Sequence, residues 1–251
     1  MDYLGLSFEQ IDEEAATALL RGRRADMAFA YLVTPNVDHV VRLSELDDDA
    51  PEARAYLLAA WRLCDSRVLS LLASLQGIAL PVVPGSDIIH RLLRDVIEPG
   101  DRVCLIGGEA GDVDLLQAMR PEAVFVQHIP PMGLRGDAGA RTRAARFAVE
   151  AAARFTLIAV GSPQQEMIAA EMHGMAGARG TGLCVGASID YIAGRESRAP
   201  RWMRRFALEW LHRLLVNPRR LWRRYLVDGP RIFLLAWRFG KTSSADRPGG
   251  H

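Results

Sequence analysis

A repeated alternation of short apolar runs and helical segments constrains the fold of this chain most strongly. The clearest apolar runs are Arg102–Ile106, Ala123–Gln127, Phe155–Val160 and Gly182–Val185, and helical segments separate them. Short buried strands that alternate with helices of about ten residues indicate βαβ units, in which consecutive strands run parallel. The sequence therefore predicts an α/β, Rossmann-like fold, with a mostly parallel sheet and helices on both faces.

The amino-terminal part of the chain shows the same pattern with shorter elements. Met27–Thr34, Ala60–Cys64 and Ile78–Val83 are predicted strands, whereas Ser7–Arg21 and Ser66–Gln76 are predicted helices. Pro-Asn and Pro-Gly dipeptides, which favour turns, close the first and the third of these strands. The parallel sheet is therefore expected to include this part of the chain.

The composition is that of an ordinary globular protein. Of the 251 residues, 49% are hydrophobic and 24% are charged, which excludes a disordered, collagen-like or coiled-coil chain. No apolar run is long enough to span a membrane, and the N-terminus lacks the layout of a signal peptide. The cysteines, Cys64, Cys104 and Cys184, lie far apart in apolar runs, so we expect buried reduced thiols and no zinc site.

The charge is distributed unevenly along the chain. Residues 195–241 carry 13 of the 31 Lys and Arg residues but only 3 of the 30 Asp and Glu residues, whereas residues 1–194 are acidic. A basic segment on an acidic body favours a polyanionic partner, such as membrane phosphates, nucleic acid or a phosphorylated ligand. We therefore expect a core over 1–194, a basic helical appendage over 195–241 and a disordered tail over 242–251.

Aromatic side chains interleave with the arginines of the basic segment. Trp202, Phe206, Trp210 and Leu214 recur every four residues and predict one helical stripe. Ile232–Trp237 is apolar, far too short to span a bilayer, and flanked by basic residues. Basic amphipathic helices with Trp at their edges suit a membrane interface.

Small and polar residues gather where the predicted strands end. In parallel α/β sheets, ligands bind beyond the carboxyl ends of the strands. The turns at these ends contain Thr34, Asn36, Asp65, Gly85, Ser86, Asp87, Gly107, Gly108, Pro131, Gly161, Pro163 and Gln165. Backbone N–H groups that open a helix are suited to hold a diphosphate. However, no GxGxxG fingerprint for a dinucleotide is present.

Several of these turns occur in a fixed order together with motifs of the basic segment. They are Thr34-Pro35-Asn36, Asp65, Gly85-Ser86-Asp87, Gly107-Gly108, Pro130-Pro131-Met132-Gly133, Gly161-Ser162-Pro163-Gln164-Gln165-Glu166, Asp190-Tyr191-Ile192-Ala193-Gly194 with Arg198-Ala199-Pro200, Leu208-Glu209-Trp210-Leu211 through Arg213-Leu214, Pro218-Arg219-Arg220 and Arg224-Tyr225. In this order, and over about residues 30–226, they resemble the WecB/TagA/CpsF family of bacterial glycosyltransferases.

The resemblance implies an inverting glycosyltransferase with a UDP-sugar donor. The acceptor would be a polyprenyl-diphosphate-linked saccharide at the cytoplasmic face of the bacterial plasma membrane, used in cell-surface polysaccharide synthesis. The C-terminal appendage would dock peripherally on the anionic membrane and complete the active site. Members of the family use N-acetylmannosamine, its uronic acid or glucose, so the sugar stays open. The acceptor saccharide and the oligomeric state, with a homo-oligomer as one option, stay open too.

The resemblance also implies catalytic residues at two turns. Asp65 matches the family's aspartate at a strand end and is the candidate base for the acceptor hydroxyl. An alternative interpretation makes Asp65 the N-cap of the following helix. The family usually has Gly after this aspartate, whereas this chain has Ser66. Thr34 and Asn36 match the active-site turn and would bind sugar hydroxyls or orient the base, unless Asn36 only caps a helix.

The remaining candidates are expected to bind the substrates. They are Gly85, Ser86, Asp87, Gly107, Gly108, Pro131, Gly161, Pro163, Gln165, Asp190, Arg213, Arg220 and Arg224. The amide of Gln165 would read a uracil edge or a ribose hydroxyl through its paired donor and acceptor. Asp190 is a second candidate acid. The three arginines would bind diphosphate, because a guanidinium offers a fork of donors that suits phosphate.

No metal-ligand motif such as HExxH is present, so we expect arginine in place of a metal and no cofactor besides the UDP-sugar substrate. Two other classes of function compete. A non-catalytic membrane-bound scaffold is motivated by Ser66 and by Val82 and Val83, which occupy the region where many relatives have a basic residue. A nucleic-acid-binding protein would use residues 195–241, but it would leave the strand-end turns unexplained, so we expect no nucleic acid.

Overall fold

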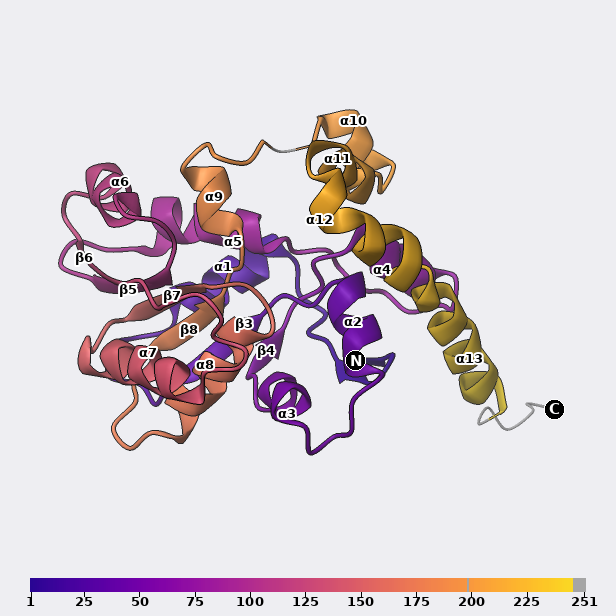
Figure 1. Cartoon of the computed structure of the whole chain (residues 1–251), viewed down its shortest axis with the longest axis horizontal. Coiled ribbons are helices and arrows are strands. Elements are labelled where there is room, and N and C mark those ends of the chain that lie inside the picture. Colours follow the sequence, from indigo (N-terminus) through magenta and orange to yellow (C-terminus); the bar gives the residue numbers. More distant parts are fainter. Residues whose placement is uncertain (198, 246–251) are drawn as a thin grey trace.

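The computed structural model describes residues 1–197 and 199–245 and contains a six-stranded parallel sheet (Figure 1). The strands lie in the order β4-β3-β8-β7-β5-β6, and all neighbouring pairs are parallel. Their bounds are β3 Ala30–Val33, β4 Trp61–Arg62, β5 Arg102–Gly107, β6 Val124–His128, β7 Phe155–Ala159 and β8 Thr181–Cys184. The predicted α/β, Rossmann-like fold is therefore confirmed.

Both faces of the sheet are apolar, because successive side chains of a strand point to opposite sides. In β5, Val103 and Leu105 belong to the hydrophobic core on one face, and Cys104 and Ile106 to the core on the other. The three cysteines are free and buried. A sheet that is apolar on both faces needs a layer of helices on each.

The helices form these two layers. The first contains α1 Glu13–Arg21, α5 Gly85–Arg91 with its π-helical continuation η1 Leu92–Val96, α6 Asp112–Met119 and α9 Ser188–Ile192. The second contains α2 Val37–Leu43, α3 Pro51–Leu57, α4 Arg67–Ser74, α7 Ala138–Glu150 and α8 Gln164–Gly174. Each strand thus delivers its carboxyl end to the same edge of the sheet, where the turns into several of these helices meet.

The segment after Gly194 adds a further group of helices. They are α10 Arg201–Arg205, α11 Glu209–Val216, α12 Pro218–Trp222, η2 Arg223–Asp228 and α13 Arg231–Ala245. In Figure 1, α13 runs along one side of the molecule, where it contacts α2 and α4. Ile232 and Ala236 of α13 are buried, so this helix contributes to the core. None of the helices in the described ranges is long and apolar enough to cross a membrane.

The N-terminus lies under the same helix. A small antiparallel sheet pairs β1 (Asp2–Tyr3) with β2 (Leu6–Ser7). The ring of Tyr3 packs edge-on against Phe239 of α13 at 5.3 Å between centroids. Because Ser7 belongs to β2, the predicted helix over Ser7–Arg21 begins too early. It begins at Glu13, because Asp12 caps it by accepting a hydrogen bond from the Ala15 N–H at 2.8 Å.

Two further local predictions are wrong. Ile78–Val83 forms no strand and makes only an isolated bridge from Val82 to Cys64. Pro81 lies inside this run and lacks the N–H that a ladder requires. The stripe from Trp202 to Leu214 is not one helix, since Ala207 adopts a positive φ of 57° between α10 and α11.

The tail also differs from expectation. Residues 242–245 belong to α13, although a disordered tail is expected from 242. Residues 246–251 lie outside the described part of the chain.

Candidate active site

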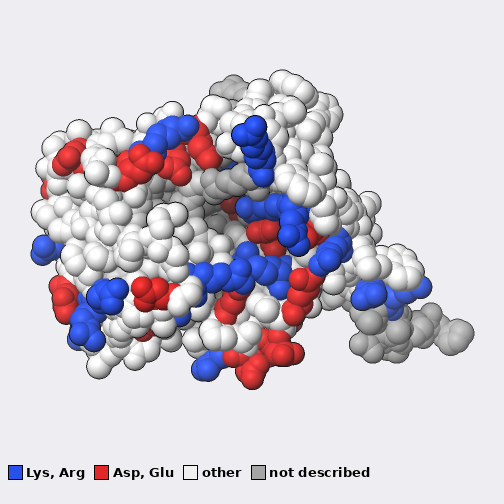
Figure 2. Space-filling view, in the orientation of Figure 1, with Lys and Arg blue, Asp and Glu red and all other residues white. Residues whose placement is uncertain are grey.

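A hollow lies between the strand ends and the C-terminal helices, and Lys and Arg side chains gather along its edge (Figure 2). It consists of two adjoining cavities of about 230 Å³ and about 350 Å³. The residues that line both are Asn36, Asp38, Asp65, Arg213, Arg224 and Tyr225. Asp65 therefore lies where the two cavities meet.

The smaller cavity, here called the strand-end cavity, is formed by the turns that follow the central strands. Its floor includes Thr34 after β3, Gly161 and Gln165 after β7, and Gly186 after β8. On the opposite side it is closed by Tyr191, His212, Arg213, Asn217 and Arg224. Backbone groups and polar side chains thus surround a space at the position where parallel α/β sheets bind ligands.

The larger cavity, here called the helix cavity, lies between α2, α4 and the C-terminal helices. Its apolar lining comes from Val37, Val68, Trp210, Ile232 and Phe233. Phe233 is also 58% exposed at the surface, so the apolar lining continues to the outside of the molecule. The two cavities therefore differ in chemistry, although they share the residues around Asp65.

The Asp65 carboxylate is held at the junction by backbone groups. The Asp65 N–H donates to the Pro35 carbonyl at 2.9 Å, and the backbone of Gly85 hydrogen-bonds the carboxylate. Burial raises the pKa of the Asp65 carboxyl to about 7, although Arg213 lowers it in part. A carboxyl group that titrates near neutral pH can accept a proton from a substrate hydroxyl.

The residue after Asp65 has a separate role. Ser66 is the N-cap of α4, and its Oγ accepts a hydrogen bond from the Leu69 N–H at 3.2 Å. The alternative interpretation, in which Asp65 caps this helix, is therefore wrong. Ser66 satisfies the helix end and leaves the carboxylate of Asp65 facing the cavities.

The turn after β3 contributes Thr34 and Asn36. Thr34 lines the strand-end cavity, and a Cβ atom on Gly85 would lie 3.1 Å from its Oγ1. Asn36 is the N-cap of α2, since its Oδ1 accepts from the Asp38 N–H at 3.1 Å. Asn36 both caps α2 and contributes to the site, because the same Oδ1 also accepts a hydrogen bond from Nη2 of Arg224 at 3.4 Å.

Two of the three predicted arginines reach the hollow. The guanidinium of Arg213 lies 5.6 Å from the centre of the Tyr191 ring and pairs with Glu209 at 3.8 Å. Arg224 pairs with Asp38 at 3.4 Å. Arg220 lies in α12, but its side chain is outside the described part of the structure.

In the predicted nucleotide-binding turn, both ends of the Gln165 side-chain amide form hydrogen bonds within the protein. Gln165 Nε2 donates to Glu166 Oε1 at 2.7 Å, and Gln165 Oε1 accepts from the Gly186 N–H at 2.8 Å. The amide therefore ties the β7 turn to the β8 turn. One hydrogen and one lone pair of this amide remain for a ligand.

Several predicted site residues do not line the two cavities. Gly107 fits between strands, since a Cβ atom there would lie 2.7 Å from the Ala159 carbonyl oxygen. Asp190 binds Arg195 at 2.8 Å, and Arg195 also binds both carboxylate oxygens of Asp112. The structure places Gly85, Asp87, Gly107, Gly108, Pro131, Pro163 and Asp190 outside the cavity linings, whereas Ser86 and Gly161 lie in that of the strand-end cavity.

Sequence reasoning missed two groups beside the site. Asp38 lines both cavities, and Arg42 lies one helical turn later and binds Ser162. Their spacing of four residues on α2 is the only signal in the sequence, and it is common in exposed helices. Within the described residues, no group of three or more His, Cys, Asp or Glu could hold a metal ion.

The chain is similar to a known protein family. A model of the glycosyl transferase WecG/TagA/CpsF family matches residues 1–245, which is nearly the whole chain. The match includes both the sheet and the C-terminal helices.

Proposed function

Because the chain belongs to the WecG/TagA/CpsF family of glycosyl transferases, which act in cell-surface polysaccharide synthesis, we propose a specific transfer for it. A sugar moves from a UDP donor to a polyprenyl-diphosphate-linked saccharide, with inversion at the anomeric carbon. The observation that carries the proposal is the place of Asp65 between a polar cavity at the strand ends and an apolar cavity open to the surface. One cavity suits a nucleotide sugar, and the other suits a lipid-linked acceptor.

Asp65 acts as the general base. Its carboxylate takes the proton of the acceptor hydroxyl while the hydroxyl oxygen forms a bond to the anomeric carbon. The bond from that carbon to the UDP phosphate oxygen breaks on the opposite face, which gives inversion. A base with a pKa of about 7 combines a substantial ionised fraction at neutral pH with enough basicity to accept the proton.

Arg213 and Arg224 stabilise the departing diphosphate. Both reach the strand-end cavity from the C-terminal helices, so charge can be neutralised where it develops. Arginine suits this role, because its guanidinium donates in parallel to two phosphate oxygens. We propose that these side chains serve at the leaving group and that the chain needs no cofactor besides its substrates.

The C-terminal helices dock on the anionic inner face of the bacterial plasma membrane. Their exposed large apolar residues are Trp202, Phe206, Leu215, Val216, Trp222, Leu226, Val227, Phe233, Leu234 and Trp237. Basic residues surround them in the sequence. Apolar side chains among cations favour insertion into the headgroup region of a bilayer with negative lipids. The acceptor would then enter the helix cavity from the membrane side.

The test is UDP release from a panel of UDP-sugars, with and without extracted polyprenyl-diphosphate-linked acceptors. We expect acceptor-dependent release from one donor, and a loss of about 100-fold or more in Asp65→Asn. Asp114→Asn, an exposed aspartate on α6, is the matched control and should keep the wild-type rate. Undiminished release in Asp65→Asn would contradict the assignment of the base. UDP binding without release from any donor would favour the non-catalytic scaffold instead.

A further inference from the structure

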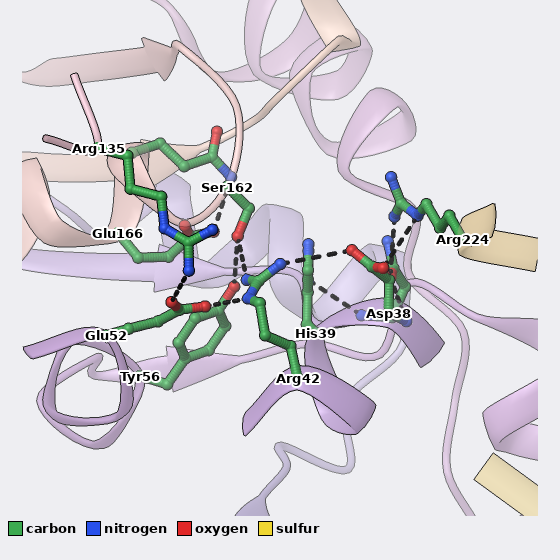
Figure 3. Close-up of polar contacts among 11 residues, drawn as sticks. Asp38, His39, Arg42, Glu52, Tyr56, Arg135, Ser162, Glu166 and Arg224 are labelled. Carbon is green, nitrogen blue, oxygen red and sulfur yellow. Dashed lines mark hydrogen bonds and ion pairs between the residues drawn. The ribbon is translucent and has the colours of Figure 1, made fainter. Parts of the chain in front are cut away.

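Arg42 lies outside both cavities and contacts Ser162, in the turn after β7, and Asp38 (Figure 3). Asp38 in turn contacts Arg224 of the C-terminal helices. We propose that Arg42 is a positioning residue for the donor turn Gly161–Gln165, and that Asp38 couples it to Arg224. The conformation of this turn and the position of the C-terminal helices then depend on each other. This inference deepens the proposed function and rests on it for the identity of the donor.

The guanidinium of Arg42 uses each of its three nitrogens inside the protein. Nη2 donates to Ser162 Oγ at 2.7 Å, Nη1 pairs with Asp38 Oδ2 at 3.4 Å, and Nε donates to the Glu52 carboxylate. In Figure 3 the group lies between these three partners, which come from three different segments of the chain. A side chain engaged in this way orients its neighbours and leaves no nitrogen without a partner for a substrate.

The turn that Arg42 holds is anchored at two places. Ser162 Oγ also lies 3.1 Å from the Tyr56 hydroxyl, which is buried beneath it. At its other end, Gln165 is fixed by Glu166 and Gly186. The two anchored residues, Ser162 and Gln165, line the strand-end cavity together with Gly161. Loss of one anchor would therefore loosen the part of the wall that faces the donor.

Asp38 extends this arrangement to the C-terminal helices. Its Oδ2 faces Arg42, and its Oδ1 faces Nε of Arg224 at 3.4 Å. Between the two arginines lies His39, whose pKa burial and both guanidiniums hold well below its usual value. His39 is therefore neutral, and the Asp38 carboxylate is the group that joins two like charges which would otherwise repel.

Coupling of this kind is reciprocal. If the seated Arg224 favours the ordered turn through Asp38 and Arg42, then a donor bound at the turn favours the seated Arg224 by the same factor. The chain thus gains a means to hold the donor most tightly when the helices that receive the acceptor are in place.

The test compares Arg42→Gln with Arg154→Gln. Arg154 is a buried arginine that pairs with Asp101 at 2.7 Å, and it immediately precedes β7, at the end opposite to Gly161. The first measurement is amide hydrogen exchange over 161–167 without substrate. The account predicts faster exchange in Arg42→Gln and in Ser162→Ala, and wild-type exchange in Arg154→Gln. Wild-type exchange in a folded Arg42→Gln or in Ser162→Ala overturns it.

The coupling has its own measurement. Arg224→Gln alone should speed amide exchange over 161–167. In a chain that already carries Arg42→Gln, it should cause no further increase in the exchange rate. An equal increase in both backgrounds overturns the coupling.

Steady-state kinetics provide the functional readout. Loss of a hydrogen bond from a charged donor predicts a rise of about 10-fold to 100-fold in the KM for the UDP-sugar in Arg42→Gln, with a smaller change in kcat. An unchanged KM for the donor contradicts the positioning role. If the wild type turns over no UDP-sugar, the proposed function fails, whereas hydrogen exchange still decides the role of Arg42.

Discussion

The two cavities that meet at Asp65 are constructed by different means. The strand-end cavity is formed by turns whose positions follow from the register of a parallel sheet, and hydrogen bonds such as that from the Gly186 N–H to Gln165 fix them further. The helix cavity is closed by side chains on helices with large exposed apolar surfaces. Under the proposed function, the floor of the donor site would depend on the core fold, whereas the acceptor site and the two arginines at the diphosphate would depend on the position of the C-terminal helices.

Removal of the C-terminal helices is the largest test of this difference. A chain that ends at Gly194 should keep its sheet but lose acceptor-dependent UDP release completely, because Arg213 and Arg224 are absent. Its free energy of unfolding should fall by about 3–5 kcal/mol, since Ile232 and Ala236 leave the core. Denaturant unfolding and UDP release measure the two effects.

A second truncation separates these effects. A chain that ends at Asp228 loses α13 but keeps both arginines, so it should show most of the loss in stability while UDP release stays detectable. Full activity in the chain that ends at Gly194 would refute the role of the C-terminal helices.

A smaller effect is expected from the exposed face of α13. Trp237 is 57% exposed, with Lys241 Nζ 3.8 Å from its ring centre. Trp237→Ser should weaken binding to anionic vesicles by about 10-fold, because an interfacial aromatic contributes about 1–2 kcal/mol. Vesicle sedimentation measures this, with Met132→Ser, a residue 99% exposed near β6, as the control. High salt should weaken binding as well. If both variants bind vesicles as the wild type does, α13 is not the docking face.

The smallest effect concerns the pH dependence at the junction itself. Because the pKa of Asp65 is raised to about 7 and the carboxylate is the active form, transfer should slow as the pH falls. The rate at pH 6 should be about five-fold below the rate at pH 7. A rate independent of pH between 5 and 8 would contradict a base with this pKa.

Stability should show the opposite trend at the same residue. Because the pKa of Asp65 is higher in the folded state than in the unfolded state, the protonated carboxyl favours the folded state at low pH. This contribution to the free energy of unfolding is lost as the pH rises through about 7. Asp65→Asn should therefore gain stability relative to the wild type as the pH increases. Denaturant unfolding at pH 5 and pH 8 measures the gain, and an equal difference at both values would contradict it.

The comparison of the cavities also explains what the sequence could predict. Strand ends can be predicted from apolar runs, so the sequence alone predicts the turns that contain Thr34, Asp65, Gly161 and Gln165. The sequence cannot show which turns meet, because that depends on strand order. Gly107 is the last residue of β5 and Gly108 follows it, one strand beyond β7, and neither residue lines a cavity.

Residues that act through a neighbour are harder to predict. Arg42 resembles any helical arginine until Ser162, 120 positions later, is found beside it. The same holds for Ile232, which lies in an apolar stretch of α13 that has no distinctive sequence pattern. It is buried because α13 packs against α2 and α4. Contacts over such distances in the chain leave no local pattern.

The most direct test of the account is a crystal structure with UDP bound. The account predicts the diphosphate in the strand-end cavity, within hydrogen-bond distance of Arg213, with Asp65 free to face the helix cavity. UDP in the helix cavity, or at the turn of Gly107 and Gly108 beyond β5, would contradict the division of the site into a donor half and an acceptor half.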